Sequence, residues 1–312
     1  EGLRLAAEGT ADPATIDALL TGSGGFRMGP FTLMDLVGLD VNLAVSKSVF
    51  AQSFHDQRFA PHVLQQSMVD AGRLGRKSGE GFFEYGDEKP RAVPQTLAPQ
   101  PAPGNVEAHG DLGWAAGLIP QLLAAGVEVD TVAAGGPGHL IFAGLHLVPT
   151  DGRTATQLAA DQVFGSDNVI VFDLVHDWDQ VSHIGIALAD QGDSGKVATV
   201  AGLFQAIGCE VSRVDDTHGM VVMRTVAQLA SVAADTVTAG VAHAADIDTA
   251  MRLGASYPSG PLEWTDRIGA GTVAAVLSNI RSGYGEDRYR VPTLISRCAA
   301  TNRPIREGGD RG

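Results

Sequence analysis

Three cations lie within five residues of one another in a chain that is otherwise acidic, namely Arg73, Arg76 and Lys77. Positive side chains grouped in this way attract phosphate, so the group could bind a phosphate-bearing ligand. Basic residues are also typical of the carboxyl end of a helix, where they offset the helix dipole. The glycine-rich turn that follows favours this second interpretation over the first.

Four apolar residues around a Gly-Pro pair could line a pocket: Phe26, Met28, Pro30 and Phe31. An apolar wall of this type suits a short hydrocarbon chain. Packing in a hydrophobic core would use the same residue types. The sequence therefore leaves a ligand pocket and a packed core as two open interpretations of this group.

Residues 106–113 have the spacing of a worn dinucleotide-binding turn, G-x-G-x-x-G, in which Ala108 replaces the first glycine. Asp111 stands where the backbone of such a turn would face a pyrophosphate, and an anion at that place repels one. We therefore expect a Rossmann-like domain that does not bind NAD.

Two other patterns fail as ligand sites. Residues 192–196 lack the first glycine of a phosphate-binding loop, and Val197 follows the lysine where Ser or Thr is needed. Two pairs of histidines have a spacing of seven without nearby cysteine or carboxylate support, which argues against a metal site: His139 with His146, and His176 with His183.

Composition narrows the class of protein. The 312 residues include 22 Lys and Arg against 36 Asp and Glu, which gives a net charge of −14. This charge argues against nucleic acid or an anionic membrane as a partner. No apolar run is long enough to span a bilayer. Two cysteines, Cys209 and Cys298, cannot form a disulfide framework, so we expect a cytoplasmic protein.

Helix signals dominate both ends of the chain, and strand signals dominate its middle. Helices are expected over 13–20, 30–37, 41–54 and 61–71. Strands over 127–132, 140–148, 168–174, 183–188 and 211–214 alternate with helices over 114–125, 154–163 and 196–207. This alternation predicts a largely parallel sheet. Dense prolines before residue 104 predict an extended linker. The expected division is a helical domain (1–86), a Pro-rich linker (87–104), a Rossmann-like domain (105–216), a second helical domain (217–302) and a tail (303–312).

The two helical domains repeat one another. An offset of 231 residues superimposes glycines, prolines, aspartates and aromatic residues in a single register: Gly9 on Gly240, Ile16-Asp17 on Ile247-Asp248, Phe26 on Tyr257, Gly29-Pro30 on Gly260-Pro261, Asp35 on Asp266 and Gly38 on Gly269. Helix punctuation explains each position, because Gly permits a turn, Pro begins a helix and Asp pairs with nearby backbone. The shared register predicts a duplication.

Residues 25–40 and 72–85 resemble the C-terminal helical domain of 3-hydroxyacyl-CoA dehydrogenases, and residues 246–251 and 257–264 carry the same signature. The domain order is similar to the long bacterial form, which is associated with 3-hydroxybutyryl-CoA or 3-hydroxyadipyl-CoA oxidation in fatty-acid or phenylacetate degradation. The resemblance implies a mostly α fold with a central α/β domain: two duplicated helical 6-phosphogluconate-dehydrogenase-like domains flank a degenerate Rossmann-like domain. It also implies that the four apolar residues line an acyl pocket and that the three cations contact a CoA phosphate.

The resemblance further implies an N-terminal Rossmann domain that binds NAD and supplies a His/Glu pair for proton transfer. An Asn on the first helix of the helical domain would precede Glu1. Met223 stands at the Asn position in the second repeat, and Ala187 stands at the His position of the middle domain. We therefore expect neither a second active site nor a bound cofactor in this chain.

On this view the chain is the C-terminal portion of an NAD-dependent dehydrogenase, is inactive alone, and has acyl-CoA and the missing NAD domain as partners. Short-form relatives dimerise through the helical domain. The repeat therefore predicts a homodimer or an intrachain pseudo-dimer about a pseudo-two-fold axis. The alternative is a non-catalytic acyl-CoA-binding or dimerisation module.

Overall fold

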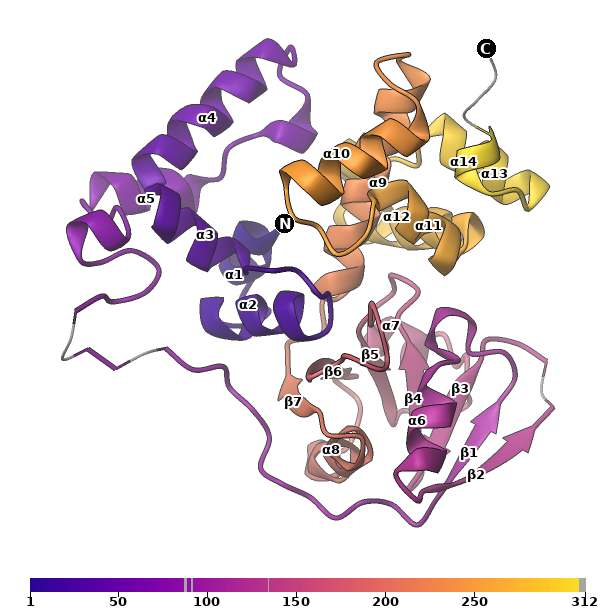
Figure 1. The fold of residues 1–312 in the computed structure, drawn as a ribbon. Helices are drawn as coiled ribbons and strands as arrows, with labels where there is room; N and C mark the ends of the chain where they lie inside the picture. Colours follow the sequence, from indigo (N-terminus) through magenta and orange to yellow (C-terminus); the bar gives the residue numbers. More distant parts are fainter. Residues whose placement is uncertain (87–88, 91, 134, 309–312) are drawn as a thin grey trace.

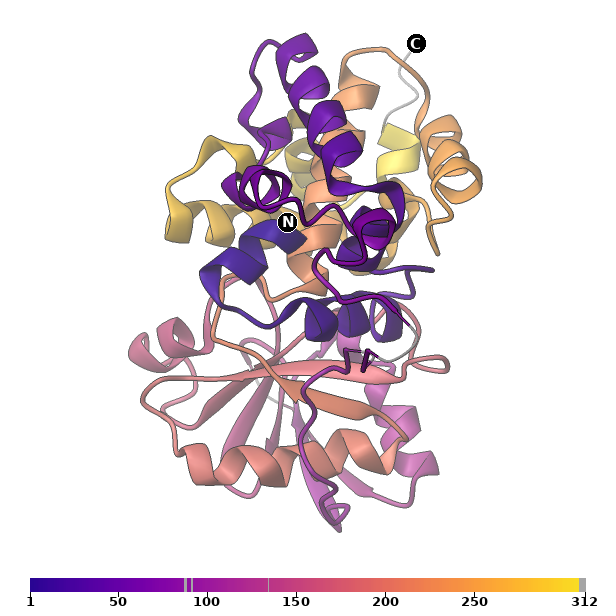
Figure 2. The same ribbon diagram turned by 90° about the vertical axis from the view of Figure 1, so that its left-hand side faces the viewer.

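A computed structural model describes residues 1–86, 89–90, 92–133 and 135–308. The described residues form a helical part that lies over one face of a seven-stranded sheet (Figure 1). Figure 2 shows the layers from the side, with the helical part above, the sheet in the middle and α8 (Val197–Ala206) beneath it. Both ends of the chain contribute to the helical part, and the middle of the chain forms the sheet.

The first helical segment follows the helix signals of the sequence. Asp12 caps its second helix by accepting hydrogen bonds from the backbone N–H groups of Ala14 (3.0 Å) and Thr15 (3.1 Å). Pro13 and Pro30 each occupy the first turn of a helix, where a missing N–H costs nothing. The helices are α1 (Gly2–Glu8), α2 (Pro13–Gly22), α3 (Pro30–Val37), α4 (Leu39–Gln52) and α5 (Val63–Asp70), with 3₁₀ turns η1 (Gln57–Phe59) and η2 (Arg76–Ser78).

The sheet runs in the order β2-β1-β3-β4-β5-β6-β7. Its strands are β1 (Asn105–His109), β2 (Glu128–Val132), β3 (His139–Phe142), β4 (Leu145–Pro149), β5 (Val169–Phe172), β6 (His183–Leu188) and β7 (Glu210–Arg213). The remaining elements of this region are η3 (Gly113–Ala115), α6 (Leu118–Ala124), α7 (Ala155–Ala160), η4 (Ser194–Lys196) and α8. The helices were expected from the sequence, whereas β1 was recognised only as the start of a worn dinucleotide motif.

The expectation of a largely parallel sheet is wrong. Parallel pairing joins β1 to β2, β4 to β5 and β6 to β7, and the other neighbouring strands pair antiparallel. The strand expected over 140–148 is a hairpin, in which Leu140 lies opposite Leu147. Ala143 (φ 53°) and Gly144 (φ 72°) form its two-residue turn. The turn has alanine, which rarely adopts positive φ, at the position where Asn or Asp is usual. The sequence therefore gave no hairpin signal here.

The second helical segment contains α9 (Val222–Thr238), α10 (Ala244–Gly254), α11 (Pro261–Ile268), α12 (Ala270–Tyr284), η5 (Asp287–Tyr289), α13 (Thr293–Thr301) and α14 (Ile305–Gly308). Within the tail expected over 303–312, Ile305 is fully buried and starts α14. Residues 309–312 of that expected tail lie outside the described residues.

Residues 92–104 contain no helix or strand, as their prolines predict, yet they are bound to the sheet domain. The Leu97 N–H donates to the carbonyl of Val211 on the edge strand β7 (2.8 Å). The Gln100 N–H donates to the side chain of Gln205 on α8 (2.8 Å). The segment therefore covers an exposed strand edge rather than hanging free. Residues 87, 88 and 91 of the expected linker lie outside the described residues.

Two hydrophobic clusters occupy the two faces of the sheet. On β5, Ile170 and Phe172 join the cluster with α6 and α8, whereas Val169 and Val171 join the cluster with the helical part. This alternation is the period-two pattern of a sheet that is covered on both faces. Within the described residues, no helix combines the length and apolarity needed to cross a bilayer.

Candidate functional site

The Asp of the first repeat holds the start of α3. The Asp17 carboxylate accepts hydrogen bonds from the N–H groups of Phe31 (2.9 Å) and Thr32 (2.8 Å) and from the Thr32 hydroxyl (2.7 Å). A Cβ on Gly29 would lie 2.2 Å from the carboxyl carbon of Asp17, so only glycine allows this approach. Burial raises the pKa of Asp17 above its usual range, against the lowering effect of these donors.

The second repeat has the same arrangement. Asp248 accepts hydrogen bonds from the N–H groups of Leu262 and Glu263, both at 2.9 Å, at the start of α11. A Cβ on Gly260 would again lie 2.2 Å from the aspartate side chain. Burial likewise raises the pKa of Asp248. These contacts confirm helix punctuation as the role of the repeated Asp and Gly-Pro.

The second aspartate shared by the two repeats, Asp35 or Asp266, binds backbone near the end of its own helical segment. Asp35 is buried and accepts hydrogen bonds from the N–H groups of Phe82 (3.0 Å) and Phe83 (2.9 Å). Asp266 accepts one from the N–H of Ile305 (2.6 Å), at the start of α14. Both aspartates therefore act as acceptors for backbone N–H groups that lie far along the sequence.

The apolar candidates lie in separate environments. Phe31 is fully buried against Phe82, with ring centroids 4.7 Å apart. Phe26 packs edge-on against Tyr257 of the second helical segment at 5.3 Å. Met28 is 38% exposed, and a Cβ added to Gly2 of α1 would lie 2.9 Å from the ring of Pro30. Core and interface packing account for Phe26 and Phe31, and an acyl pocket at these four residues stays a prediction.

Two of the three cations are paired with carboxylates. The Arg73 guanidinium lies 2.8 Å from Glu80, and the Lys77 ammonium is bonded to Asp40. The Arg76 guanidinium lies over the ring of Tyr85, 5.6 Å from its centroid. Arg76 and Lys77 belong to the 3₁₀ turn η2, and Arg73 precedes it by three residues. Their contact with a CoA phosphate stays a prediction.

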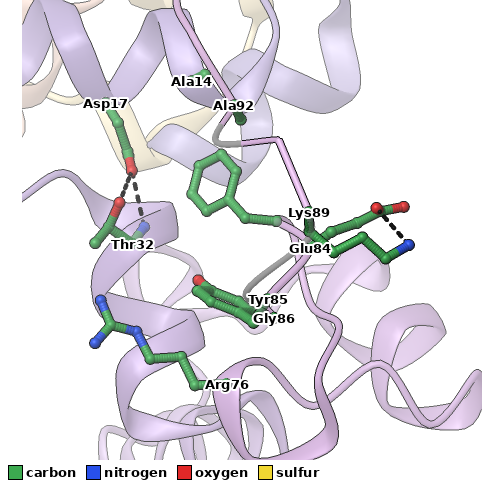
Figure 3. A pocket seen from close by; sticks show the side chains of 10 residues that line it. Ala14, Asp17, Thr32, Arg76, Glu84, Tyr85, Gly86, Lys89 and Ala92 are labelled. Carbon is green, nitrogen blue, oxygen red and sulfur yellow. Dashed lines mark hydrogen bonds and ion pairs between the residues drawn. The ribbon is translucent and has the colours of Figure 1, made fainter.

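A cavity of about 560 Å³ lies beside Arg76 (Figure 3). Its wall combines charged, hydroxyl and aromatic groups: Ala14, Asp17, Thr32, Arg76, Phe83, Glu84, Tyr85, Gly86, Lys89 and Ala92. Lys89 and Glu84 form an ion pair at 2.9 Å. Burial and a hydrogen bond to Asp35 raise the pKa of Tyr85 to about 12, so this phenol is a donor at neutral pH. None of the four apolar candidates is among the cavity's described lining residues.

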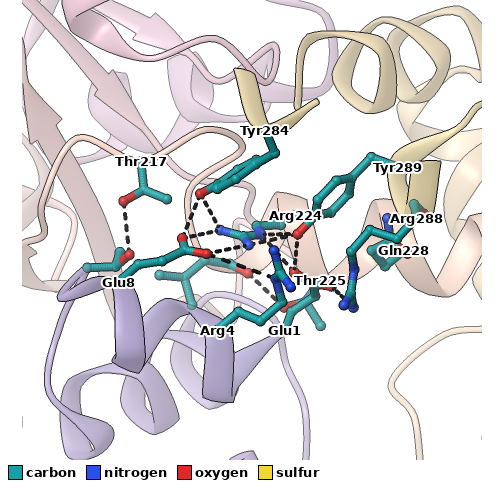
Figure 4. A network of polar contacts seen from close by, with 12 residues as sticks. Glu1, Arg4, Glu8, Thr217, Arg224, Thr225, Gln228, Tyr284, Arg288 and Tyr289 are labelled. Carbon is teal, nitrogen blue, oxygen red and sulfur yellow. Dashed lines mark hydrogen bonds and ion pairs between the residues drawn. The ribbon is translucent and has the colours of Figure 1, made fainter. Parts of the chain in front are cut away.

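A buried arginine joins the two helical segments (Figure 4). Arg224 on α9 is fully buried and donates to Glu8 (2.9 and 3.1 Å) and Glu1 (2.7 Å) of α1 and its N-cap. It also donates to the hydroxyls of Tyr284 (2.9 Å) and Tyr289 (2.7 Å). Burial opposes the charge of Arg224, but these carboxylates and hydroxyls raise its pKa above the usual range. Sequence reasoning missed this group, although a lone Arg within an apolar run was a visible signal.

Corresponding elements of the two segments also meet across their boundary. Arg58 of η1 reaches Asp235 near the end of α9 at 2.5 Å. The equivalent arginine of the second segment, Arg288 of η5, lies 2.6 Å from the carboxylate of Glu1, which precedes α1. The turns η1 and η5 contact one another. Reciprocal contacts of this kind are typical of a two-fold interface.

Asp173, at the end of β5, was not identified from the sequence. Its fully buried carboxylate accepts hydrogen bonds from the N–H groups of Val221 (2.9 Å), Val222 (2.7 Å) and Met223 (3.0 Å) at the start of α9. Burial raises its pKa to about 6. Met223 is itself fully buried, as is Ala187 on β6. The positions that resemblance assigns to Asn and His therefore belong to the core.

In the degenerate dinucleotide turn, the Asp111 side chain bonds to the backbone of the turn itself. The Asp111 carboxylate accepts a hydrogen bond from the N–H of Gly113 (2.8 Å), which a phosphate would need as a donor. A Cβ on Gly138 would lie 2.0 Å from the Asp111 carbonyl oxygen. The backbone just before β3 therefore packs directly against this turn. That this domain does not bind NAD stays a prediction.

The remaining motifs lie in the sheet domain. His109, His139 and His146 stack in series across β1, β3 and β4, with centroids 5.1 and 5.2 Å apart. Burial lowers the pKa of His139 and His146. Within the described residues, no group of three His, Cys, Asp or Glu side chains is arranged to hold a metal ion. Lys196 belongs to the short turn η4.

Comparison with known families assigns the fold. The model of the 3-hydroxyacyl-CoA dehydrogenase C-terminal domain matches residues 1–85 and 219–312, which make up more than half of the chain. The model of the reduced Rossmann-fold domain of 3-hydroxybutyryl-CoA dehydrogenase matches residues 147–217. The chain belongs to the 3-hydroxyacyl-CoA dehydrogenase family, a family of oxidoreductases.

Individual relatives agree with this assignment. The 3-hydroxyadipyl-CoA dehydrogenase of Escherichia coli (strain K12) is 35% identical over 300 residues, which are 96% of this chain and 56% of that protein. A probable 3-hydroxybutyryl-CoA dehydrogenase of Deinococcus radiodurans is 44% identical over 85 residues, 27% of this chain and 30% of that protein. The crystal structure of 3-hydroxybutyryl-CoA dehydrogenase from Escherichia coli K12 matches with a TM-score of 0.81 and 32% identity, over 96% of this chain and 57% of that one. The chain thus spans little more than half the length of the two Escherichia coli relatives.

Proposed function

We propose that this chain is the C-terminal portion of an NAD-dependent 3-hydroxyacyl-CoA dehydrogenase that oxidises the 3-hydroxyl of a short-chain acyl-CoA to a ketone. The observation that carries the proposal is 35% identity along 96% of the chain to a protein named 3-hydroxyadipyl-CoA dehydrogenase. The cofactor would bind a Rossmann domain that precedes Glu1 and supplies the His/Glu pair. The hydrogen bond from the Gly113 N–H to Asp111 supports this placement, because a phosphate at the turn would need that donor.

In this proposal the chain contributes the substrate side and the assembly, acts in cytoplasmic fatty-acid or phenylacetate-type degradation, and is inactive alone. Arg76 is the cation that we favour for a CoA phosphate, because it borders a cavity of about 560 Å³. Arg73 and Lys77 would have to exchange their carboxylate partners for the ligand. An acyl chain would lie near Met28, the one exposed member of the apolar group.

We also propose that residues 1–86 and 217–302 arose by duplication and pair as an intrachain pseudo-dimer. The matching Asp17 and Asp248 caps support the duplication. The reciprocal contacts of Arg58 and Arg288 support a pseudo-two-fold arrangement. The alternative function for this chain is that of a non-catalytic acyl-CoA-binding or dimerisation module.

The test compares two proteins in NAD-linked oxidation of 3-hydroxybutyryl-CoA and 3-hydroxyadipyl-CoA, followed by NADH absorbance. One is the 312-residue chain. The other is a fusion in which the part of the Escherichia coli relative that precedes the aligned region is placed before Glu1. We expect activity from the fusion only. Activity of the 312-residue chain would contradict the placement of the cofactor, and an inactive but folded fusion would favour the non-catalytic module.

Binding of 3-hydroxybutyryl-CoA to the 312-residue chain, measured by calorimetry, tests the substrate side. Loss of one charge-assisted phosphate contact in Arg76→Ala should weaken binding by about tenfold. Arg281→Ala removes an exposed arginine far from the cavity and serves as the matched control. Equal affinity of both variants would exclude Arg76 as a phosphate ligand.

A further inference from the structure

Three histidines form a row of stacked rings across neighbouring strands of the sheet. His109 of β1 pairs directly with His139 of β3, and their ring centroids are 5.1 Å apart. His146 of β4 pairs with Ile141, two residues beyond His139, so the three imidazoles lie on one face of the sheet. The ring centroids of His139 and His146 are 5.2 Å apart. We call these three residues the histidine stack.

The ring of Phe164 lies against the histidine stack. Phe164 belongs to residues 161–168, which lead from α7 to β5 and which we call the 161–168 loop. Its ring centroid is 4.6 Å from that of His139 and 5.6 Å from that of His146. Phe164 also packs against the hydrophobic cluster that the sheet shares with the helical part. The loop is therefore held on the sheet by one ring that contacts both the stack and the shared core.

The surroundings of the stack suit neutral imidazoles. The Nδ1 atom of His146 is buried and has no hydrogen-bond partner among the described residues. A neutral ring can keep its lone pair at this atom, whereas an imidazolium would place an N–H there without an acceptor. The Nδ1–H of His139 donates to the carbonyl of Pro137 (3.1 Å), so a second proton on that ring would have to bind Nε2.

The charges around the stack add to this preference. Burial lowers the pKa of His139 and of His146, and the neighbouring histidines of the stack lower both further. Glu107 of β1 lies 2.8 Å from Nε2 of His109, at the other end of the row. Strand β5 contributes the apolar Val169 opposite His146. Further charged side chains on the surrounding elements are Glu128 and Asp130 of β2, Asp161 and Asp167 of the loop, and Lys196 of η4, which lies near the hairpin turn at Gly144.

We propose that the histidine stack is a proton-sensitive switch, in which neutral rings hold Phe164 and proton uptake by His139 or His146 releases the 161–168 loop. A charged ring must regain water, and two charged rings at this separation repel one another. Release of Phe164 would uncover the edge of the cluster that joins the sheet to the helical part. The switch therefore links pH to the contact between the two, whichever reaction the family member performs.

The direction of the pH effect follows from the lowered pKa of the two rings. The closed loop binds protons more weakly than the open one, so its stability is fully present above the ordinary histidine value of 6.5 and is lost as the pH falls. Each ring that must take up a proton adds to this loss. The histidines act together, so the response belongs to the stack rather than to one ring.

Hydrogen–deuterium exchange of the 312-residue chain at pH 7 and pH 5.5 tests the switch. Rates are divided by the intrinsic exchange rates at each pH, which gives protection factors. We expect protection in β3, β4 and the 161–168 loop to fall by up to about tenfold for each ring that takes up a proton, because pH 5.5 is one unit below about 6.5. Protection in α13, which contains no histidine, should stay unchanged.

Substitutions show whether the stack is responsible. His146→Phe keeps an aromatic ring that cannot titrate, and His139→Asn keeps a side-chain donor for the carbonyl of Pro137. Each variant should lose part of the pH response, and the double variant should lose all of it. The control His55→Asn removes an exposed histidine of the first helical segment, whose φ of 64° suits asparagine, and should keep the full response.

Three results would overturn the proposal. The first is equal protection of the 161–168 loop at both pH values. The second is an equal loss of protection in α13, because acid would then unfold the whole chain. The third is a full pH response in the double variant, which would assign the effect to other groups. The two single variants are measured separately, so a failure of one to fold leaves the other as a test, and the readout does not use catalysis.

Discussion

Single aspartates hold this fold together by accepting backbone N–H groups at helix starts. The substitution Asp248→Ala removes such an acceptor and leaves the backbone N–H groups of Leu262 and Glu263 without a partner. We expect the free energy of unfolding to fall by about 1–2 kcal/mol. Asp70→Ala, which changes an exposed residue at the end of α5, should stay within about 0.5 kcal/mol. Urea denaturation of both variants measures the two free energies of unfolding. Equal decreases in the two variants would show that Asp248 does not stabilise the start of α11.

Asp173 adds a pH dependence, because burial raises its pKa from 3.8 to about 6. A carboxyl with a higher pKa in the folded state binds its proton more tightly there, so protonation stabilises the fold. This contribution is complete below pH 3.8 and is lost as the pH rises through 6. Asp173→Asn cannot ionise. Its unfolding free energy relative to the natural chain should therefore increase between pH 4 and pH 7, and parallel pH curves in urea denaturation would contradict the assignment.

Among the elements, the Pro-rich segment and α8 depend on a close approach at Gly202. Alanine in place of a helical glycine usually stabilises by about 1 kcal/mol. At Gly202, however, a Cβ would lie 2.1 Å from the Pro101 carbonyl. We expect Gly202→Ala to lower the melting temperature and to speed proteolytic cleavage within residues 92–104. Gly271→Ala on α12 meets no atom within 4 Å and is the control, which should be neutral or stabilising. Unchanged cleavage of Gly202→Ala would show that the segment is not held there.

The elements also show where sequence reasoning succeeds. Pro30 and Asp12 carry local signals for helix starts, so α2 and α3 began where they were expected. The hairpin turn at Ala143 carries no such signal, because the backbone there is imposed by strand pairing. The docking of Leu97 on β7 and the burial of Arg224 depend on residues more than a hundred positions away. Contacts of this range cannot be read from local spacing, whereas the repeat, which compares the sequence with itself, carried long-range information.

At the scale of the whole molecule, the helical part and the sheet share one hydrophobic cluster. That cluster joins Leu19 of α2 and Val171 of β5 to Val226 of α9. The Pro-rich segment adds a second connection through β7. We therefore expect the described parts to unfold together rather than as separate domains. Because Arg224 joins the two helical segments, we expect one substitution there to lower the stability of the helical part and the sheet together.

Arg224→Met tests this coupling. The change keeps most of the side-chain volume but removes a cation from the buried carboxylate of Glu1, which should cost about 3–5 kcal/mol. Variants that retain only Trp264, between the helical segments, or only Trp178, on the sheet side, report each region by fluorescence. Their thermal midpoints should coincide in the natural chain and fall together in Arg224→Met. The control Arg281→Met breaks an exposed ion pair. It should lower the free energy of unfolding by less than about 1 kcal/mol, so both midpoints should stay nearly unchanged. A drop at Trp264 alone would mean that the sheet unfolds independently of the paired helical segments.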